Sequence, residues 1–120
     1  MSEKTKDPVP QGKYVPATRG GSLIFTAGMT PRKDGVLQFS GKVEARNRLE
    51  PGEKISRVLS MTVYVNAGEG FTAHSKIADF ASEYLCEELG EAGTAARAAV
   101  GVASLPGEAP VEVQIVCMVE

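Results

Sequence analysis

The chain of 120 residues contains no tryptophan, a single histidine and two cysteines. One histidine is too few for a zinc site or a two-histidine ribonuclease centre built from one chain, so we expect neither a metal nor a cofactor. Cys86 and Cys117 do not make the dense disulfide framework of a small secreted domain. We therefore expect reduced thiols and a cytoplasmic location.

Long hydrophobic runs are also absent. The longest apolar runs, such as residues 113–119, fall far short of the ~20 residues that a membrane helix requires, so we expect no membrane contact. With 42% hydrophobic and 23% charged residues, the chain has the composition of one globular domain over residues 1–120. Residues 1–11 are charged and spaced by prolines, which predicts a flexible N-terminal segment.

The two halves of the chain differ in charge, although the net charge is only -2. Residues 1–60 hold 11 Lys and Arg against 6 Asp and Glu, whereas residues 61–120 hold 2 against 9. Such a split can mark a nucleic-acid face, or oppositely charged surfaces that meet within the fold or between subunits. No basic cluster with interleaved aromatics accompanies the split, so we favour the second explanation and expect no nucleic-acid partner.

Alternation of apolar and polar residues predicts strands in the first half of the chain. Residues 22–27 and 36–39 are predicted to form a hairpin, because a turn signal at Lys33-Asp34-Gly35 lies between them. Residues 58–65 form the clearest strand. Its apolar face is predicted to hold Leu59, Met61, Val63 and Val65.

The second half predicts a helix and two strands. Apolar residues at helical spacing are Ile77, Phe80, Ala81, Tyr84 and Leu85, and His74 lies near the helix start. Residues 98–103 and 111–119 predict strands joined as a hairpin by the turn-rich residues 105–110. On the last strand Val111, Val113, Ile115, Cys117 and Val119 share one face. Strands followed by a helix on one side of the sheet indicate an α+β domain.

Arg97 stands between pairs of alanines at the start of a strand of small residues. If its side chain points into a pocket walled by alanine and glycine, the guanidinium can bind a carboxylate through two parallel hydrogen bonds. The alternative is an ordinary surface ion pair. Position alone leaves both possibilities open.

Several motifs resemble the RidA/YjgF family, also called endoribonuclease L-PSP or translation initiation inhibitor. They are Gly12-Lys13-Tyr14, residues 24–28, Thr62-Val63-Tyr64-Val65, and above all Ala96-Arg97-Ala98-Ala99-Val100 followed by Leu105-Pro106 and Val111-Glu112-Val113. The match covers most of the chain. Residues 90–93 and 101–106 resemble a less studied branch of the family.

This resemblance implies a chorismate-mutase-like protomer, with a mixed sheet and helices on one face, assembled as a homotrimer with ligand sites between subunits. It implies that water hydrolyses a reactive enamine or imine that carries a carboxylate, giving a keto acid and ammonia. Arg97 matches the arginine that binds the substrate carboxylate and Glu112 a site glutamate, and we take both as catalytic. Tyr14, Ala27 and Ala99 are the further substrate-binding positions.

The sequence departs from the best-known members at several site positions. Ala27, Met29, Ser75 and Ala99 stand where those members have serine, glutamine, asparagine and cysteine. The identity of the substrate is therefore left open. Hydrolysis itself needs little more than a positioned water and a group that binds the carboxylate, because an iminium carbon is already electrophilic. Two alternatives remain: a non-catalytic metabolite-binding or chaperone-like protein on the same scaffold and, ranked last, an endoribonuclease, for which no paired acid and base groups are visible.

One expected helix is almost absent. The family has a long amphipathic helix between a hairpin that Lys42-Val43 would close and the strand starting near Arg57, but here only residues 44–49 look helical. We expect roughly 15 to 20 residues to be missing near residues 41–46, either deleted or left out of the numbering. Residues 58–65 and the last strand carry apolar residues on both faces. A single helix covers only one face, which also favours a homotrimer.

Overall fold

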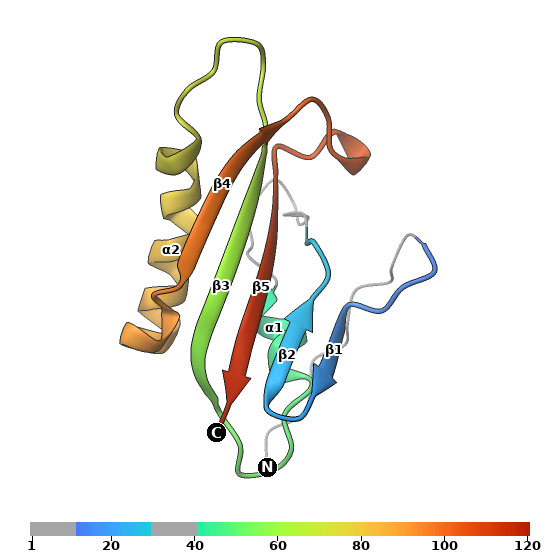
Figure 1. Cartoon of the computed structure of the whole chain (residues 1–120), viewed down its shortest axis with the longest axis vertical. Helices are drawn as coiled ribbons and strands as arrows, with labels where there is room; N and C mark the ends of the chain where they lie inside the picture. Colours follow the sequence, from blue (N-terminus) through green and yellow to red (C-terminus); the bar gives the residue numbers. More distant parts are fainter. Residues whose placement is uncertain (1–11, 30–40) are drawn as a thin grey trace.

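The computed structural model describes residues 12–29 and 41–120 (Figure 1). Its strands are β1 (Ala17–Gly20), β2 (Leu23–Thr26), β3 (Ile55–Asn66), β4 (Ala96–Val102) and β5 (Val111–Val119). Its helices are α1 (Gly41–Arg46) and α2 (His74–Leu89), with single 3₁₀ turns at Gly90–Gly93 and Pro106–Glu108. The strands form one mixed sheet in the order β1-β2-β5-β3-β4, with the helices against one face. This arrangement confirms the predicted α+β fold.

The longest strand, β3, organises the sheet. It pairs in parallel with β4 and antiparallel with β5, and α2 carries the chain from β3 to β4. The predicted hairpin of residues 98–103 with 111–119 is therefore wrong, because β3 lies between β4 and β5. Turn-rich residues fix a reversal of the chain, but they do not fix which strands become neighbours.

A short hairpin forms the other edge of the sheet. β1 was not predicted from the sequence, yet it pairs with β2 across a turn at Gly21, which has a φ of 58°. β5 pairs with the other edge of β2. β1 and β5 thus occupy both edges of β2, and the partner predicted for residues 22–27 is not among the described strands. Residues 36–39, their turn and the predicted flexible segment 1–11 lie outside the described residues.

The core lies between the sheet and the helices. The predicted inward face of β5 is confirmed, because its five alternate residues are all buried: Val111, Val113, Ile115, Cys117 and Val119. On β3 the prediction is right for residues 61–65 but wrong for Leu59, which is 37% exposed. A register shift against β5 between Val58 and Ser60 interrupts the alternation, so Val58 takes the inward position instead.

The helical cover of the sheet is unequal. α2 begins at His74, as predicted, and buries Ala78, Ala81 and Leu85. Phe80 was expected on the packed stripe, but it is 61% exposed. α1 is short and lies over β2 and β5, while α2 lies over β3 and β4. The side of α2 that faces α1 therefore has less to pack against, which explains the exposure of Phe80.

The chain runs without a break where we expected residues to be missing. α1 is an unbroken helix over residues 41–46, so the prediction of a gap there is wrong. Lys42-Val43 belong to this helix and do not close a hairpin. The Lys42 ammonium pairs with Glu88 at 2.8 Å and lies 5.1 Å from the centre of the Tyr84 ring. These contacts tie the short helix to α2. Within the described ranges, the sheet is thus covered by one principal helix and one helix of 6 residues.

Candidate functional site

Arg97 lies on β4, the edge strand beside α2. It pairs with the buried Met61, so its side chain is on the helix-covered face of the sheet. Nη1 donates hydrogen bonds to Asp79 Oδ1 and Ser82 Oγ, each at 2.8 Å. Nη2 donates to the hydroxyl of Ser75 at 2.8 Å and to its carbonyl at 3.2 Å. We call these four residues the Arg97 cluster.

The three partners of Arg97 form a polar stripe on α2. Ser75, Asp79 and Ser82 are spaced i, i+4 and i+7, so they share one side of the helix. Asp79 and Ser82 were not predicted as site residues, although this spacing was visible in the sequence. Of the two possibilities for Arg97, the ion pair is present, and the Arg97 side chain as a whole is only 18% exposed. Ala99 faces the same side as Arg97 and packs partly against the core.

Glu112 lies on the opposite face of the sheet. It stands on β5 opposite Tyr64, whereas Arg97 shares its face with Met61. A Cβ atom at Gly28 would come within 2.5 Å of Glu112 Oε2, so a side chain there would require the Glu112 carboxylate to move from its present position. Within one protomer, therefore, the sheet separates the two predicted catalytic residues.

Ala27 belongs with Glu112 rather than with Arg97. Ala27 directly precedes Gly28, and its backbone N–H donates to the Pro16 carbonyl at 2.8 Å. This bond holds the segment before β1 against the end of β2. Tyr14 lies two residues before Pro16 and is 51% exposed. The predicted site residues thus fall into two groups, Arg97 with Ala99 on one face and Glu112 with Ala27 near the other.

The remaining reactive side chains have structural surroundings. Burial raises the pKa of the Cys117 thiol to about 11, which keeps it protonated and a poor nucleophile at neutral pH. The His74 ring packs edge-on against Phe71, with the ring centres 5.3 Å apart. The described residues contain no group of three or more His, Cys, Asp or Glu able to hold a metal. None of the described helices is long and apolar enough to cross a membrane.

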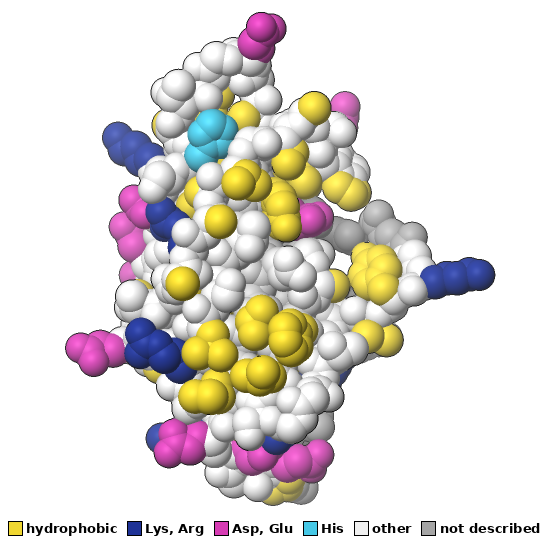
Figure 2. Space-filling view, in the orientation of Figure 1, with side chains coloured by type: hydrophobic (Ala, Val, Ile, Leu, Met, Phe, Trp, Pro, Cys, Tyr) yellow, Lys and Arg dark blue, Asp and Glu magenta, His cyan; other side chains and the backbone are white. Residues whose placement is uncertain are grey.

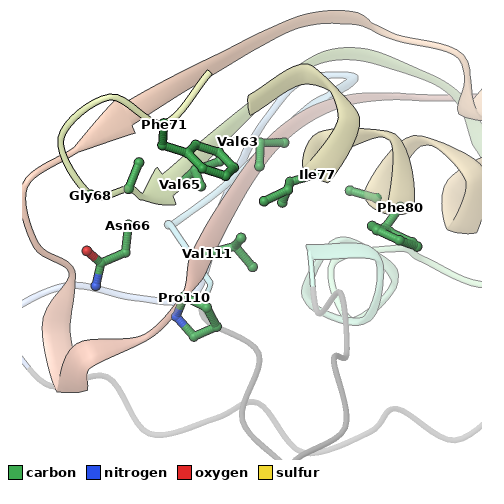
Figure 3. A pocket seen from close by; sticks show the side chains of 11 residues that line it. Val63, Val65, Asn66, Gly68, Phe71, Ile77, Phe80, Pro110 and Val111 are labelled. Carbon is green, nitrogen blue, oxygen red and sulfur yellow. The ribbon is translucent and has the colours of Figure 1, made fainter. Parts of the chain in front are cut away.

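A cavity of about 310 Å³ opens between α2 and the ends of β3 and β5 (Figure 3). Its walls are mainly apolar and include Val63, Val65, Phe71, Ile77, Phe80 and Val111. It contains none of the predicted site residues. The cavity lies where α2 has no long helical neighbour. In the sequence, the short helical stretch at residues 44–49 was the feature that could have indicated it.

The face of the sheet away from the helices carries an apolar patch. Figure 2 shows hydrophobic side chains gathered over the lower halves of the strands. Register pairs Phe25 with Val116, and Met118 lies beside them on β5. The bulge in β3 adds Leu59 to the same face. We call these four residues the open-face patch; three of them are substantially exposed, namely Phe25, Leu59 and Met118.

The comparisons with known proteins agree on one family. The model of the endoribonuclease L-PSP family matches residues 4–119. Protein TCP17 of Trypanosoma cruzi is 38% identical over 95 residues, which cover 78% of this chain, and the chain spans 58% of that protein's length.

Solved structures show the same fold. Atu1372 of Agrobacterium tumefaciens, a protein of unknown function, superposes with a TM-score of 0.76 at 27% identity, covering 93% of this chain and 86% of its own. E. coli TdcF with bound serine superposes with a TM-score of 0.61 at 23% identity, covering 92% of this chain and 91% of its own. The chain belongs to the endoribonuclease L-PSP family, which is the RidA/YjgF family that its motifs predict.

Proposed function

We propose that this protein hydrolyses a reactive enamine or imine that carries a carboxylate, giving a keto acid and ammonia. The observation that carries the proposal is the Arg97 cluster, in which an arginine side chain that is 18% exposed is held on an edge strand of small residues. Ala99, the next residue on the same face of β4, has only a small side chain, which favours a ligand beside Arg97. A planar guanidinium is well suited to bind a carboxylate. TdcF, which shares the fold, was solved with serine, a small molecule that carries one carboxylate.

The proposed site needs two protomers. Arg97 and Glu112 lie on opposite faces of the sheet, so a site that contains both requires the Glu112 of a second copy. The open-face patch supports such an assembly, because contiguous exposed apolar side chains commonly mark a protein interface. In a homotrimer with head-to-tail contacts, each protomer offers its Arg97 to one neighbour and its Glu112 to the other. Tyr14 and Ala27 would approach the ligand from the Glu112 side.

The proposed reaction is a hydrolysis in which no electrons leave the substrate. An enamine first takes a proton on carbon and becomes an iminium ion. Water then adds to the iminium carbon, forming a carbon–oxygen bond, while Glu112 accepts the proton that the water releases. Glu112 returns this proton to the amino group. The carbon–nitrogen bond then breaks, and ammonia leaves as the hydroxyl group passes its proton to Glu112 and becomes the carbonyl. Release of that proton to ammonia or to water restores the Glu112 carboxylate. Arg97 holds the carboxylate so that the iminium carbon faces the water.

A second candidate is a non-catalytic protein that binds small carboxylates. The extensive hydrogen bonding of Arg97 by its own chain favours this alternative, because a saturated guanidinium is less available to a substrate. Both candidates require Arg97, so the measurement must be of turnover as well as binding.

The first test follows the decay of an imine released by an amino-acid oxidase, with and without the protein. We expect the wild-type protein to accelerate the decay, and we expect Arg97→Ala and Glu112→Gln to abolish the acceleration. Binding of the keto acid with no acceleration would favour the non-catalytic candidate. Neither binding nor acceleration would refute both.

The second test mixes the two inactive variants. If Arg97 and Glu112 meet across subunits, unfolding and refolding Arg97→Ala and Glu112→Gln together should restore about a quarter of the wild-type rate, since one site in four then receives both intact residues. Each variant refolded alone is the control. A mixture as inactive as its parts, or a sedimentation mass of one protomer at micromolar concentration, would refute the shared site.

A further inference from the structure

The Arg97 guanidinium is nearly saturated by its own chain. An arginine has five N–H donors, and four of those on Arg97 bond to Asp79, Ser82 and the two oxygens of Ser75. Among the described residues only the Nε hydrogen of Arg97 lacks an acceptor. A substrate carboxylate that binds through both oxygens must therefore displace at least one of these acceptors.

Asp79 is the acceptor that a substrate carboxylate can replace most directly. Among residues 12–29 and 41–120 it is the only charged partner of Arg97, and it has the same headgroup as the incoming ligand. It contacts the guanidinium through Oδ1 alone, and its side chain is 56% exposed, against 18% for that of Arg97. A displaced Asp79 carboxylate already has water beside it, so it recovers its hydration at little cost.

Asp79 is the charged group of α2 that contacts Arg97 directly. Lys76 and Glu83, about one turn before and after Asp79, carry opposite charges and largely offset each other. A displaced Asp79 stays on its helix, one side chain away from Arg97, and keeps its charge. It therefore repels a ligand that brings a second carboxylate into the site.

We propose that Asp79 is a specificity-determining residue, an internal carboxylate that a substrate displaces from Arg97 and that restricts the site to small monocarboxylates. This inference rests on the proposed binding of a substrate carboxylate by Arg97. It assigns a role to a residue that lies outside the predicted site, and it names the class of ligand that the site accepts.

Two ligands of equal chain length test the proposal. 2-Oxopentanoate has one carboxylate and 2-oxoglutarate has two, and their affinities are measured by calorimetric titration of the whole protein. We compare the wild type with Asp79→Asn, which removes the charge but keeps the shape. The matched control is Glu83→Gln, which removes the same charge from an exposed position one turn further along α2.

We expect the wild type to bind 2-oxopentanoate more tightly than 2-oxoglutarate. Asp79→Asn should tighten the binding of 2-oxopentanoate by about fivefold, which corresponds to the ~1 kcal/mol of a partly exposed ion pair. It should tighten the binding of 2-oxoglutarate by a larger factor, so that the preference for 2-oxopentanoate over 2-oxoglutarate becomes smaller. Glu83→Gln should change either affinity by less than about twofold, because its charge is more distant and screened.

Several results would overturn the inference. Weaker binding in Asp79→Asn would make Asp79 a residue that positions Arg97 rather than one that competes for it, and an unchanged preference would refute the selection for monocarboxylates. Arg97→Ala separates this failure from that of the proposed function: if it abolishes binding, only the role of Asp79 is wrong, whereas unchanged binding refutes the function itself. If Asp79→Asn does not fold, Asp79→Ser applies the same test with a neutral acceptor.

Discussion

Two arginines of this protein pair with carboxylates in different ways. Arg19 on β1 meets both oxygens of Glu53, and two further donors reach the carbonyls of Gly21 and Arg48. Arg97 meets one oxygen of Asp79 and otherwise bonds to Ser75 and Ser82. Glu53 is 27% exposed, about half the exposure of Asp79. The first pair ties the β1–β2 hairpin to the chain that follows α1, whereas the second holds an arginine through a partner that can leave.

This difference shows that an ion pair is not in itself evidence for structure or for function. A bidentate pair whose other donors end on backbone carbonyls fixes two segments of chain together. A pair through one oxygen, at the exposed surface of a helix, constrains the arginine and leaves it open to exchange. The following variants test this distinction, from the largest expected effect to the smallest.

The comparison predicts opposite consequences for removing the two arginines. Arg97→Ala should weaken the binding of 2-oxopentanoate by about a hundredfold or more, because two hydrogen bonds between charged groups are lost. Its stability to urea should change little. Arg19→Ala should lower the free energy of unfolding and leave the affinity of the folded protein unchanged. Calorimetric titration gives the affinity of each variant, and urea unfolding gives its stability. Equal losses of affinity in the two variants would show that the two arginines do not differ in function.

Ser82 sharpens the comparison within the Arg97 cluster. Its hydroxyl accepts a hydrogen bond from Nη1 without competing in charge with a substrate, so its role is to orient the guanidinium. Ser82→Ala should therefore weaken the binding of 2-oxopentanoate by up to about fivefold, because the guanidinium loses one hydrogen bond that orients it. The sign is opposite to that expected for Asp79→Asn. Tighter binding in Ser82→Ala would show that both acceptors compete with the ligand.

The smallest effect concerns acid stability. The hydrogen bonds from Arg19 lower the pKa of Glu53 from 4.5 to about 2. A carboxylate with a lower pKa in the folded protein contributes stability above the unfolded value, and this contribution is lost as the pH falls from about 4.5 towards 2. The difference in urea midpoint between the wild type and Glu53→Gln should therefore become smaller as the pH falls through that interval. A difference that stays constant from pH 6 to pH 2 would contradict the structural role of this pair.

Helices and strands were predictable where the pattern of apolar residues is long, but the pairing of the strands was not. The alternation over residues 111–119 gave the buried face of β5, and the spacing from Ile77 to Leu85 gave α2. Period-two patterns carry no information on which strands become neighbours, so β4 was paired with the wrong strand. A single bulge at Leu59 was enough to reverse part of a face, because one extra residue puts the alternation before the bulge out of step with the alternation after it.

The candidate site was half visible in the sequence. Arg97 stood out because an arginine among small residues needs a partner, and the family motif singled out Glu112. The partner itself lies on another element, 18 residues before Arg97. The stripe of Ser75, Asp79 and Ser82 could have been recognised as one polar side of a helix, but only the pairing of β4 beside α2 brings that side to Arg97. The separation of Arg97 from Glu112 likewise depends on strand register, which the motifs do not contain.

The strand order also constrains how this protein folds. β5 is the strand furthest along the chain in the sheet, yet it lies between β2 and β3. Until β5 docks, the protein consists of a β1–β2 hairpin and a β3–α2–β4 unit that share no pairing partner. The step that joins them must close a contact between residues as far apart as Leu23 and Met118, and such distant contacts slow folding because of the entropy of loop closure. Substitutions on β5 should therefore slow the joining of two preformed halves, whereas those on β1 should leave the folding rate nearly unchanged and accelerate unfolding.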